Sequence, residues 1–159
     1  MAKEIERKFL IDLEKIGSLE DGTVMKQGYI TTKDKTVVRV RLAGEKAYLT
    51  LKGENTGISR IEFEYEIPVI DAQEIMTELC NGPVVEKTRY LVENYGHTWE
   101  VDIFHGDNDG LVVAEIELGS EAEKFELPHW VTEEVSGDAK YYNSSLLDKP
   151  FKNWTLTST

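Results

Sequence analysis

The sequence predicts a fold dominated by β-strands, of the α+β class, in which eight antiparallel strands form a barrel and a few helices pack on its outside. Two observations lead to this prediction. Eight short segments alternate between apolar and polar residues, and short turns separate most of them. The few helical segments carry apolar stripes that need a sheet face to cover. We expect residues 1–159 to form a single domain, with residues 150–159 as a loosely packed tail.

The strands are recognised by their alternation and by the residues that end them. The segment 36–42 is the clearest, because it is rich in β-branched residues, and Pro68 ends the fifth strand. The expected strands span residues 4–10, 25–31, 36–42, 47–52, 59–67, 84–92, 97–104 and 111–118.

The strongest helix signal begins at Asp71, an expected N-cap with Glu74 three residues later, and Asn81-Gly82-Pro83 should end this helix. Its apolar stripe consists of Ile75, Met76 and Leu79. One helical turn is expected at 13–16 and a short acidic helix at 121–126. A last helix should start at Asp138 and carry Tyr141, Tyr142, Leu146 and Leu147.

Composition excludes several classes of protein. The chain carries 18 basic and 30 acidic residues, a formal net charge of −12, which argues against binding to a nucleic-acid backbone. The single cysteine, Cys80, cannot form an intramolecular disulfide. The N-terminus lacks the apolar run of a signal peptide, and no stretch is long enough to span a membrane. We therefore expect a cytoplasmic protein with no membrane partner, either a monomer or a homodimer.

The first strand introduces an ionic face. Residues two apart share one face of a strand, so Glu4, Glu6 and Lys8 point one way while Ile5 and Phe9 point the other. Taken alone, such a face is most simply a solvated one. Almost every later strand repeats the division into an apolar and an ionic face, which is also compatible with an ordinary barrel that is apolar inside and charged outside.

Two features favour an ionic interior instead. The charges are sorted by strand, with Arg39 and Arg41 on one strand and Glu115 and Glu117 on another, whereas a merely solvated face tends to mix signs. The apolar stripes of the helices also require an apolar outer face. Buried charges need partners, so such an interior suggests a polyanion held by Lys and Arg, with divalent cations held by Glu and Asp.

At this point the motifs resemble those of the CYTH proteins, also called triphosphate tunnel metalloenzymes. The resemblance begins with the ExExK pattern of Glu4-Ile5-Glu6-Arg7-Lys8 and extends over nearly the whole chain, to about Asn143. Length and motifs are similar to those of the short bacterial inorganic tripolyphosphatases, including clostridial ones. The further matching segments are Gln27-Gly28-Tyr29, Arg39-Val40-Arg41, Leu49-Thr50-Leu51-Lys52, residues 59–64, residues 86–90, Glu100-Val101-Asp102 and residues 114–117.

The resemblance implies a tunnel open at both ends, with Mg²⁺ or Mn²⁺ as one or two bound ions. The implied metal residues are Glu4, Glu6, Glu62, Glu64, Asp102, Glu115 and Glu117, with Glu62 and Glu64 as ligands or supporting hydrogen-bond partners. The implied triphosphate-binding residues are Lys8, Arg39, Arg41, Lys52, Arg60, Lys87, Arg89 and Lys140. The implied catalytic set is Glu4, Glu6, Lys8, Lys87 and Tyr29.

Three of these assignments keep an alternative. Arg60 is either a phosphate contact or the internal partner of a neighbouring glutamate. Tyr29 either positions the leaving phosphate beside Lys87 or packs as a strand tyrosine. Lys140 falls where relatives often carry a basic residue near the tunnel mouth, and its role on substrate or in structure stays open.

The activity implied by the resemblance is metal-dependent hydrolysis of inorganic tripolyphosphate to pyrophosphate and phosphate, with weaker action on nucleoside triphosphates. The same family also contains adenylate cyclases of the class IV type and thiamine triphosphatases, which are the nearest alternatives. A non-catalytic polyphosphate-binding module is the alternative of another class. No phosphate-loop, zinc-protease or serine-hydrolase motif competes with this interpretation.

Overall fold

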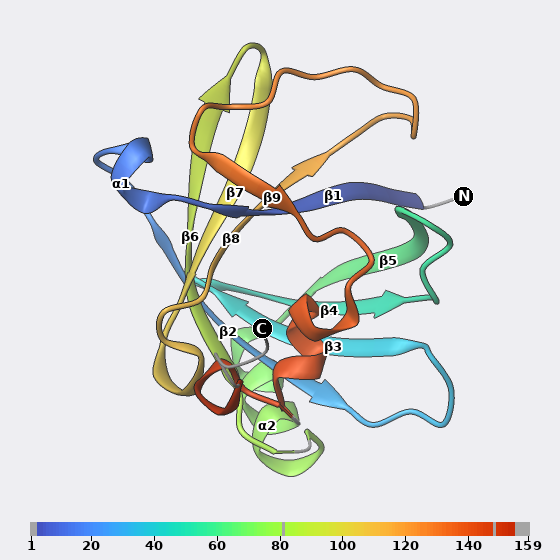
Figure 1. Ribbon diagram of the computed structural model, residues 1–159. Helices are drawn as coiled ribbons and strands as arrows, with labels where there is room; N and C mark the ends of the chain where they lie inside the picture. The colour runs from blue at the N-terminus through green and yellow to red at the C-terminus, as the bar shows by residue number, and fades with distance from the viewer. Residues whose placement is uncertain (1–2, 81, 148, 155–159) are drawn as a thin grey trace.

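The computed structural model describes residues 3–80, 82–147 and 149–154, and their strands form one strongly curved antiparallel sheet (Figure 1). In this described part the order is β5-β4-β3-β2-β6-β7-β8-β1-β9, and a further pairing of β5 with β1 closes the first eight strands into a barrel. The strands are β1 (Lys3–Ile11), β2 (Thr23–Ile30), β3 (Val37–Ala43), β4 (Lys46–Lys52), β5 (Ser59–Ile67), β6 (Val85–Asn94), β7 (His97–Phe104), β8 (Val112–Glu117) and β9 (Val131–Glu134). The eight-stranded barrel expected from the sequence is confirmed.

The helical elements of the described residues are short. Two are α-helices, α1 (Leu13–Ile16) and α2 (Val69–Glu78). Four are 3₁₀ turns: η1 (Gly106–Asn108), η2 (Ala139–Tyr141), η3 (Asn143–Leu147) and η4 (Phe151–Asn153). In this part of the chain, no helix is both long enough and apolar enough to cross a membrane.

β1 is the strand that closes the barrel. Its first residues pair with β5, with Glu4 opposite Arg60, and its middle pairs with β8, with Lys8 opposite Glu115. Its end also pairs with β9, where Phe9 lies opposite Glu134. One strand therefore joins the N-terminal and C-terminal halves of the barrel wall.

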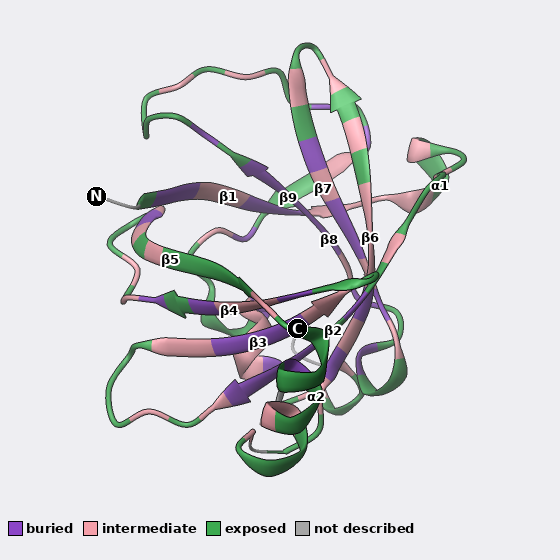
Figure 2. Cartoon of the chain, turned by 180° about the vertical axis from the view of Figure 1, so that it is seen from behind, coloured by how far each residue is buried: buried purple, intermediate pink, exposed green. Residues whose placement is uncertain are grey.

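The outer face of the barrel is apolar and is covered in two places. α2 packs Ala72 against Val40 of β3 and Ala47 of β4. On the other side, Phe9 and Trp99 pack with Trp130, which comes from the segment between β8 and β9. Figure 2 shows buried stretches within β7 and β8, whereas much of β5 is exposed.

The inner face becomes apolar at one end of the barrel. There Tyr29, Phe104 and Val113 pack with Tyr141 and Leu146 of the C-terminal segment, η2 and η3. This packing fills that end of the interior, which differs from the tunnel open at both ends that the resemblance implies. The rest of the inner face is available for the charged side chains.

Two helix predictions are wrong in detail. α2 starts at Val69, directly after Pro68, so Asp71 lies in the first turn and is not the N-cap. In the first turn, the negative charge of its carboxylate still interacts favourably with the positive end of the helix dipole. The predicted helix at 121–126 is a turn followed by irregular chain, in which Phe125 reaches the rings of Phe9 and Trp99. These tertiary contacts outweigh the weak local preference for a helix.

The C-terminal region differs most from expectation. In place of the predicted last helix, the chain forms two 3₁₀ turns, η2 and η3. At the start of η2, the side chain of Asp138 accepts a hydrogen bond from the backbone N–H of Lys140. The strand β9 was not predicted. Phe151 and Trp154 pack against the cluster at the closed end, so the start of the expected loose tail is packed. Asn81 of the predicted helix stop, the side chain of Leu147 and residues 155–159 of the tail lie outside the described residues.

Candidate active site

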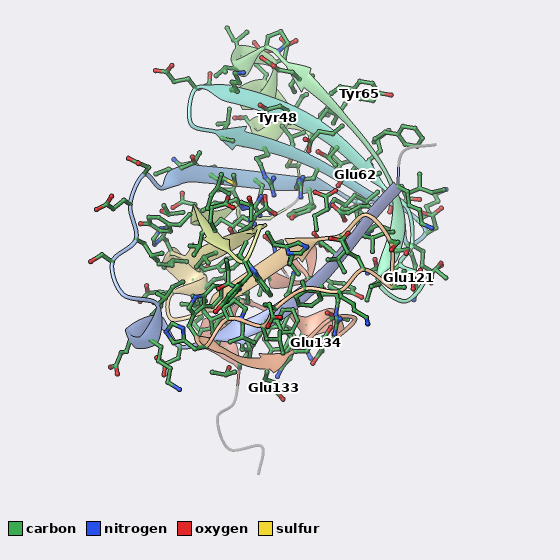
Figure 3. All side chains as sticks on the ribbon, turned by 90° about the horizontal axis from the view of Figure 1, so that it is seen from above. Tyr48, Glu62, Tyr65, Glu121, Glu133 and Glu134 are labelled. Atoms are coloured by element: carbon green, nitrogen blue, oxygen red, sulfur yellow. The ribbon has the colours of Figure 1, made fainter. Side chains whose placement is uncertain are left out.

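The alternation of the strands divides the side chains between the interior and the outside of the barrel. On β1, Glu4, Glu6 and Lys8 line an internal pocket, whereas Phe9 belongs to the outer apolar cluster. β5 shows the same division, with Glu62 on the inner side and Tyr65 on the outer side (Figure 3). The ionic face therefore lies inside, as the sorting of charges along the strands predicts.

The pocket has a volume of about 210 Å³ and a balanced charge. Among the described residues, seven acidic and seven basic side chains line it, although the whole chain carries a net charge of −12. The acidic residues are Glu4, Glu6, Glu62, Glu64, Glu100, Glu115 and Glu117. The basic residues are Lys8, Arg39, Arg41, Lys52, Arg60, Lys87 and Arg89. Except for Glu100, the sequence assigned all of them to the site.

Glu4 of β1 and Glu62 of β5 share the ammonium of Lys52. Lys52 Nζ lies 3.2 Å from Glu4 Oε2 and 3.2 Å from Glu62 Oε2. Burial raises the pKa of Glu4 to about 7 against the attraction of Lys52, and Glu62 adds to the increase. Burial also opposes ionisation of Glu62, but a hydrogen bond from Glu4 and the charge of Lys52 keep its pKa below the ordinary value. The two carboxyl groups therefore favour a single shared proton.

Glu6 of β1 and Glu115 of β8 form a second carboxyl pair. Burial, and then the charge of Glu115, raise the pKa of Glu6 well above its ordinary value. Burial opposes ionisation of Glu115, but Lys8, whose Nζ lies 3.5 Å from Glu115 Oε1, and the hydrogen bond from Glu6 lower its pKa well below the ordinary value. This pair also holds one proton between two carboxyl groups.

The chemistry of these two pairs fits a divalent cation. Their donors are all carboxylate oxygens, which Mg²⁺ and Mn²⁺ prefer, and a cation relieves the same repulsion that the shared proton relieves. Within residues 3–80, 82–147 and 149–154, no three His, Cys, Asp or Glu side chains already converge as a ready metal site. The carboxylates are held instead by Lys52 and Lys8, so metal binding requires these ion pairs to rearrange.

Arg39 of β3 has unused hydrogen-bonding capacity. Its Nη2 donates to Thr50 Oγ1 at 3.3 Å and to Glu64 Oε2 at 3.4 Å, which are long distances for such bonds. Its Nε is buried and has no hydrogen-bond partner among the described residues. A buried donor without an acceptor is costly, so the guanidinium is prepared for an anionic ligand in the pocket.

Cationic side chains of β3 and β6 cluster on one side of the pocket. Burial, together with the charges of Arg39 and Arg89, lowers the pKa of Arg41 to about 10. Burial, together with Arg89 and Arg41, lowers the pKa of Lys87 to about 7, despite the opposing attraction of Asp102. This mutual repulsion marks a place where an anion is stabilised.

Asp102 lies behind this group of cations and is fully buried. Lys87 Nζ lies 2.7 Å from its Oδ2, and Arg89 donates to both of its oxygens at 2.8 and 2.9 Å. Asp102 is not among the residues that line the pocket, whereas Glu100, two residues earlier on β7, is. The geometry makes Asp102 a counter-ion for Lys87 and Arg89, in contrast to its implied place among the metal residues.

The structure distinguishes two further assignments. Arg60 lines the pocket and its Nε donates to the backbone oxygen of Gly53 at 3.0 Å. Lys140 is exposed and does not line the pocket; its ammonium lies 5.1 Å from the ring centre of Tyr141 and 4.9 Å from that of Trp154. These aromatic faces hold the charge of Lys140 outside the pocket lining, and its role at the substrate stays a prediction.

Several polar residues of the site were missed. Asn55, Ser136 and Asn143 line the pocket, and the fully buried Gln27 contacts its Tyr29. All four are neutral, and only Gln27 gives a signal in the sequence, because it shares the inner face of β2 with Tyr29. Asn143 reaches the pocket from the C-terminal segment, which crosses in front of the strands in Figure 1. Nothing in the alternation of the strands could have placed it there.

Comparison with known proteins agrees with this architecture. The family model described as the CYTH domain matches residues 2–148. A relative from Acetivibrio thermocellus named inorganic triphosphatase is 53% identical over 97% of this chain and 99% of its own length. Another of that name, from Nitrosomonas europaea, is 40% identical over 90% of this chain and 95% of its own. A solved structure described as the inorganic triphosphatase NE1496 has a TM-score of 0.63 and 35% identity, covering 92% of this chain and 95% of its own.

Proposed function

The chain belongs to the CYTH domain family, whose members require a divalent metal, and from this premise we propose that it hydrolyses inorganic tripolyphosphate to pyrophosphate and phosphate. The observation that carries the proposal is the lining of the pocket. Buried carboxyl pairs face one part of it, and Arg39, with a buried Nε that lacks an acceptor, faces another. Such a lining suits a compact polyanion that brings its own cations.

The basic residues bind and orient the substrate. Arg39, Arg41 and Arg89 offer planar guanidinium groups to phosphate oxygens, and Lys8, Lys52 and Lys87 offer ammonium groups. Where Glu4, Glu6, Glu62 and Glu115 hold a cation, Lys8 and Lys52 would lose these carboxylates as partners and would bind phosphate oxygens instead. Binding of the cation and binding of the substrate would therefore favour each other.

The acidic residues hold Mg²⁺ or Mn²⁺, as one or two ions. The bound cation neutralises phosphate charge and lowers the pKa of a water molecule, which is the chemistry that hydrolysis needs. Glu4 and Glu6 of β1 are the central ligands, with Glu62, Glu64, Glu115 and Glu117 as further oxygen donors. Holding the terminal phosphoryl group between the two kinds of side chain permits in-line attack by water.

Nucleoside triphosphates are proposed as secondary substrates. A wider pocket of about 710 Å³ adjoins the first and shares Tyr29, Asn55 and Tyr142 with it. A nucleoside can project there while the phosphates occupy the charged pocket. The phosphate groups make most of the strong contacts, so the base adds little to recognition.

The test compares phosphate release from tripolyphosphate and from ATP, in Mg²⁺ and in Mn²⁺, with EDTA as control. We expect EDTA-sensitive release that strongly favours tripolyphosphate. Formation of cyclic AMP and pyrophosphate from ATP would identify a cyclase instead. Preferred turnover of thiamine triphosphate would identify a thiamine triphosphatase, and tight binding without turnover would leave a binding module.

A further inference from the structure

A network of carboxamide groups lies between the charged pocket and its closed end. Gln27 of β2 is fully buried, and its Oε1 accepts a hydrogen bond from Arg41 Nε at 2.8 Å. A guanidinium can only donate, so this bond fixes the orientation of the Gln27 amide. The Gln27 Nε2 group must then donate on the other side, where it lies 2.7 Å from Tyr29 Oη and 3.0 Å from Asn143 Oδ1.

This orientation determines what the Tyr29 hydroxyl can do. Since Gln27 Nε2 carries only hydrogens, the hydroxyl oxygen is the acceptor in their bond. The hydroxyl hydrogen of Tyr29 is therefore left to donate elsewhere. Tyr29 lines both the charged pocket and the adjoining one, so an oxygen of a bound phosphate is a suitable acceptor.

Asn143 is oriented in the same way from its other side. Lys87 Nζ donates a hydrogen bond to Asn143 Oδ1 at 2.7 Å. Asn143 Oδ1 thus accepts hydrogen bonds from both Lys87 and Gln27. Every bond from Arg41 through Gln27 to Asn143 then joins a donor to an acceptor. With Asp102 as a second partner, two of the three N–H bonds of Lys87 are directed by described residues. The third is left for a ligand.

We propose that Gln27 and Asn143 form a positioning pair, which fixes Lys87 Nζ and the Tyr29 hydroxyl so that both donate to the same phosphoryl group of a bound triphosphate. This inference rests on the function proposed above and adds two neutral residues to it. The pair is neutral, so it directs the donors without neutralising the charge that attracts the substrate. Asn143 also makes the C-terminal segment part of the site.

The first test is Gln27→Glu, an isosteric change that removes the Nε2 donor. The new carboxylate forces Tyr29 to donate its hydrogen inward, so kcat for tripolyphosphate should fall about 10- to 100-fold. Tyr29→Phe and the double variant complete a thermodynamic cycle. If Gln27 acts partly through Tyr29, the combined loss is at least about tenfold smaller than the product of the separate losses. Losses that multiply to within about twofold would show a merely structural role and overturn the proposal.

The second test is Asn143→Leu, which keeps the size of the side chain and removes the acceptor. We expect about a tenfold fall in kcat in the native background and no further fall in a Lys87→Ala background. Asn143→Asp, which keeps the acceptor, should retain more activity than Asn143→Leu. The matched control is Lys149→Ala, at an exposed position of the same segment outside the pocket lining, with unchanged kinetics. Equal losses from Asn143→Leu in both backgrounds would contradict the assignment, and this arm stands even if Gln27→Glu does not fold.

Binding separates this proposal from the proposed function. Calorimetry with inorganic tripolyphosphate in EDTA requires neither metal nor turnover, and Gln27→Glu should raise the Kd about tenfold. A native protein that binds tripolyphosphate but does not hydrolyse it would refute the proposed activity. The positioning pair would still be supported if the Kd rises in Gln27→Glu. A Kd that does not change in Gln27→Glu would refute the pair whatever the activity.

Discussion

Two arginine–carboxylate pairs with the same geometry lie on opposite faces of this barrel. Outside, Arg7 donates from Nε and Nη2 to Glu134 at 2.8 and 2.5 Å, and the two side chains are 31% and 34% exposed. Inside, Arg89 donates from Nε and Nη2 to Asp102 at 2.8 and 2.9 Å, with exposures of 11% and 0%. The chemical groups are nearly identical, but the inner pair is shielded from solvent and Asp102 also pairs with Lys87.

The difference shows what each pair contributes. Water screens the outer pair, which ties β9 to β1 and is worth little more than a surface ion pair. The inner pair has lost its water, so Arg89 without Asp102 would be a buried charge with only the partly exposed Glu100 as its partner. Its value is to keep Arg89 charged and in place beside the pocket. The predictions below separate the two faces, beginning with the largest expected effect.

The largest effect is expected for Glu6→Gln, on the inner face of β1. The change removes a proposed metal ligand and leaves the volume of the side chain unchanged. We therefore expect kcat to fall by more than the 10- to 100-fold that is typical of residues that only support a ligand. Steady-state phosphate release measures it, with circular dichroism to check the fold. Glu66→Gln, exposed and outside the pocket lining, is the matched control. Normal turnover in Glu6→Gln would remove this residue from the metal assignment.

Asp102→Asn tests the inner ion pair directly. It removes the anion that pairs with Lys87 and leaves Arg89 with Glu100 alone, so the free energy of unfolding should fall by about 3–5 kcal/mol. Urea denaturation measures this loss. A stable variant that has lost metal affinity would instead make Asp102 a ligand of the cation, contrary to its position behind the pocket.

The inner carboxyl groups should also give the metal-free protein an unusual dependence on pH. Burial raises the pKa of Glu4 from 4.5 to about 7, so the folded state holds this proton more tightly than the unfolded state. The resulting stabilisation, about 3 kcal/mol at most, is complete below about pH 4.5 and is lost as pH rises through about 7. Thermal unfolding in EDTA between pH 5 and 8 should show a falling Tm. Glu4→Gln should flatten that slope, and an unchanged slope would assign it to other groups.

The smallest effect is expected for Glu134→Gln on the outer face. Its hydrogen bonds from Arg7 lower the pKa of Glu134, so the outer pair stabilises above about pH 4.5 and is lost as pH falls, the opposite sign to Glu4. Solvent limits the contribution to about 0.2–1 kcal/mol. Urea denaturation at pH 7 measures it, and kinetics should not change. A loss as large as that of Asp102→Asn would mean that burial does not explain the difference between the two pairs.

The barrel wall was predictable because alternation along a strand is a local property. Arg39 and Arg41 of β3 share one face because β-strands alternate, and the sorting of charges by strand favoured the inner face on which the structure places them. The structure was needed where long-range contacts decide. β9 is short and polar, and it exists because Phe9 and Leu10 of β1 offer it an edge.

The site was predictable to the same extent. Charged residues on the strands could be assigned, but burial alone separates Asp102, behind the cations, from Glu100, on the pocket. Asn143 is neutral and lies on a 3₁₀ turn far along the chain from Gln27 and Lys87. Its place in the network depends on how the C-terminal segment packs into the closed end, which no local pattern encodes.

The position of β1 has a consequence for the synthesis of the protein. This strand is synthesised well before its partners on β8 and β9, and its pairing with β5 involves only Lys3, Glu4 and Ile5. Until β8 and β9 have emerged, β1 carries an unpaired edge, and its four apolar residues are without cover. Closure of the barrel is therefore a late, non-local event of the kind that slows folding. The strand that supplies the central carboxylates is also the one whose docking completes the molecule.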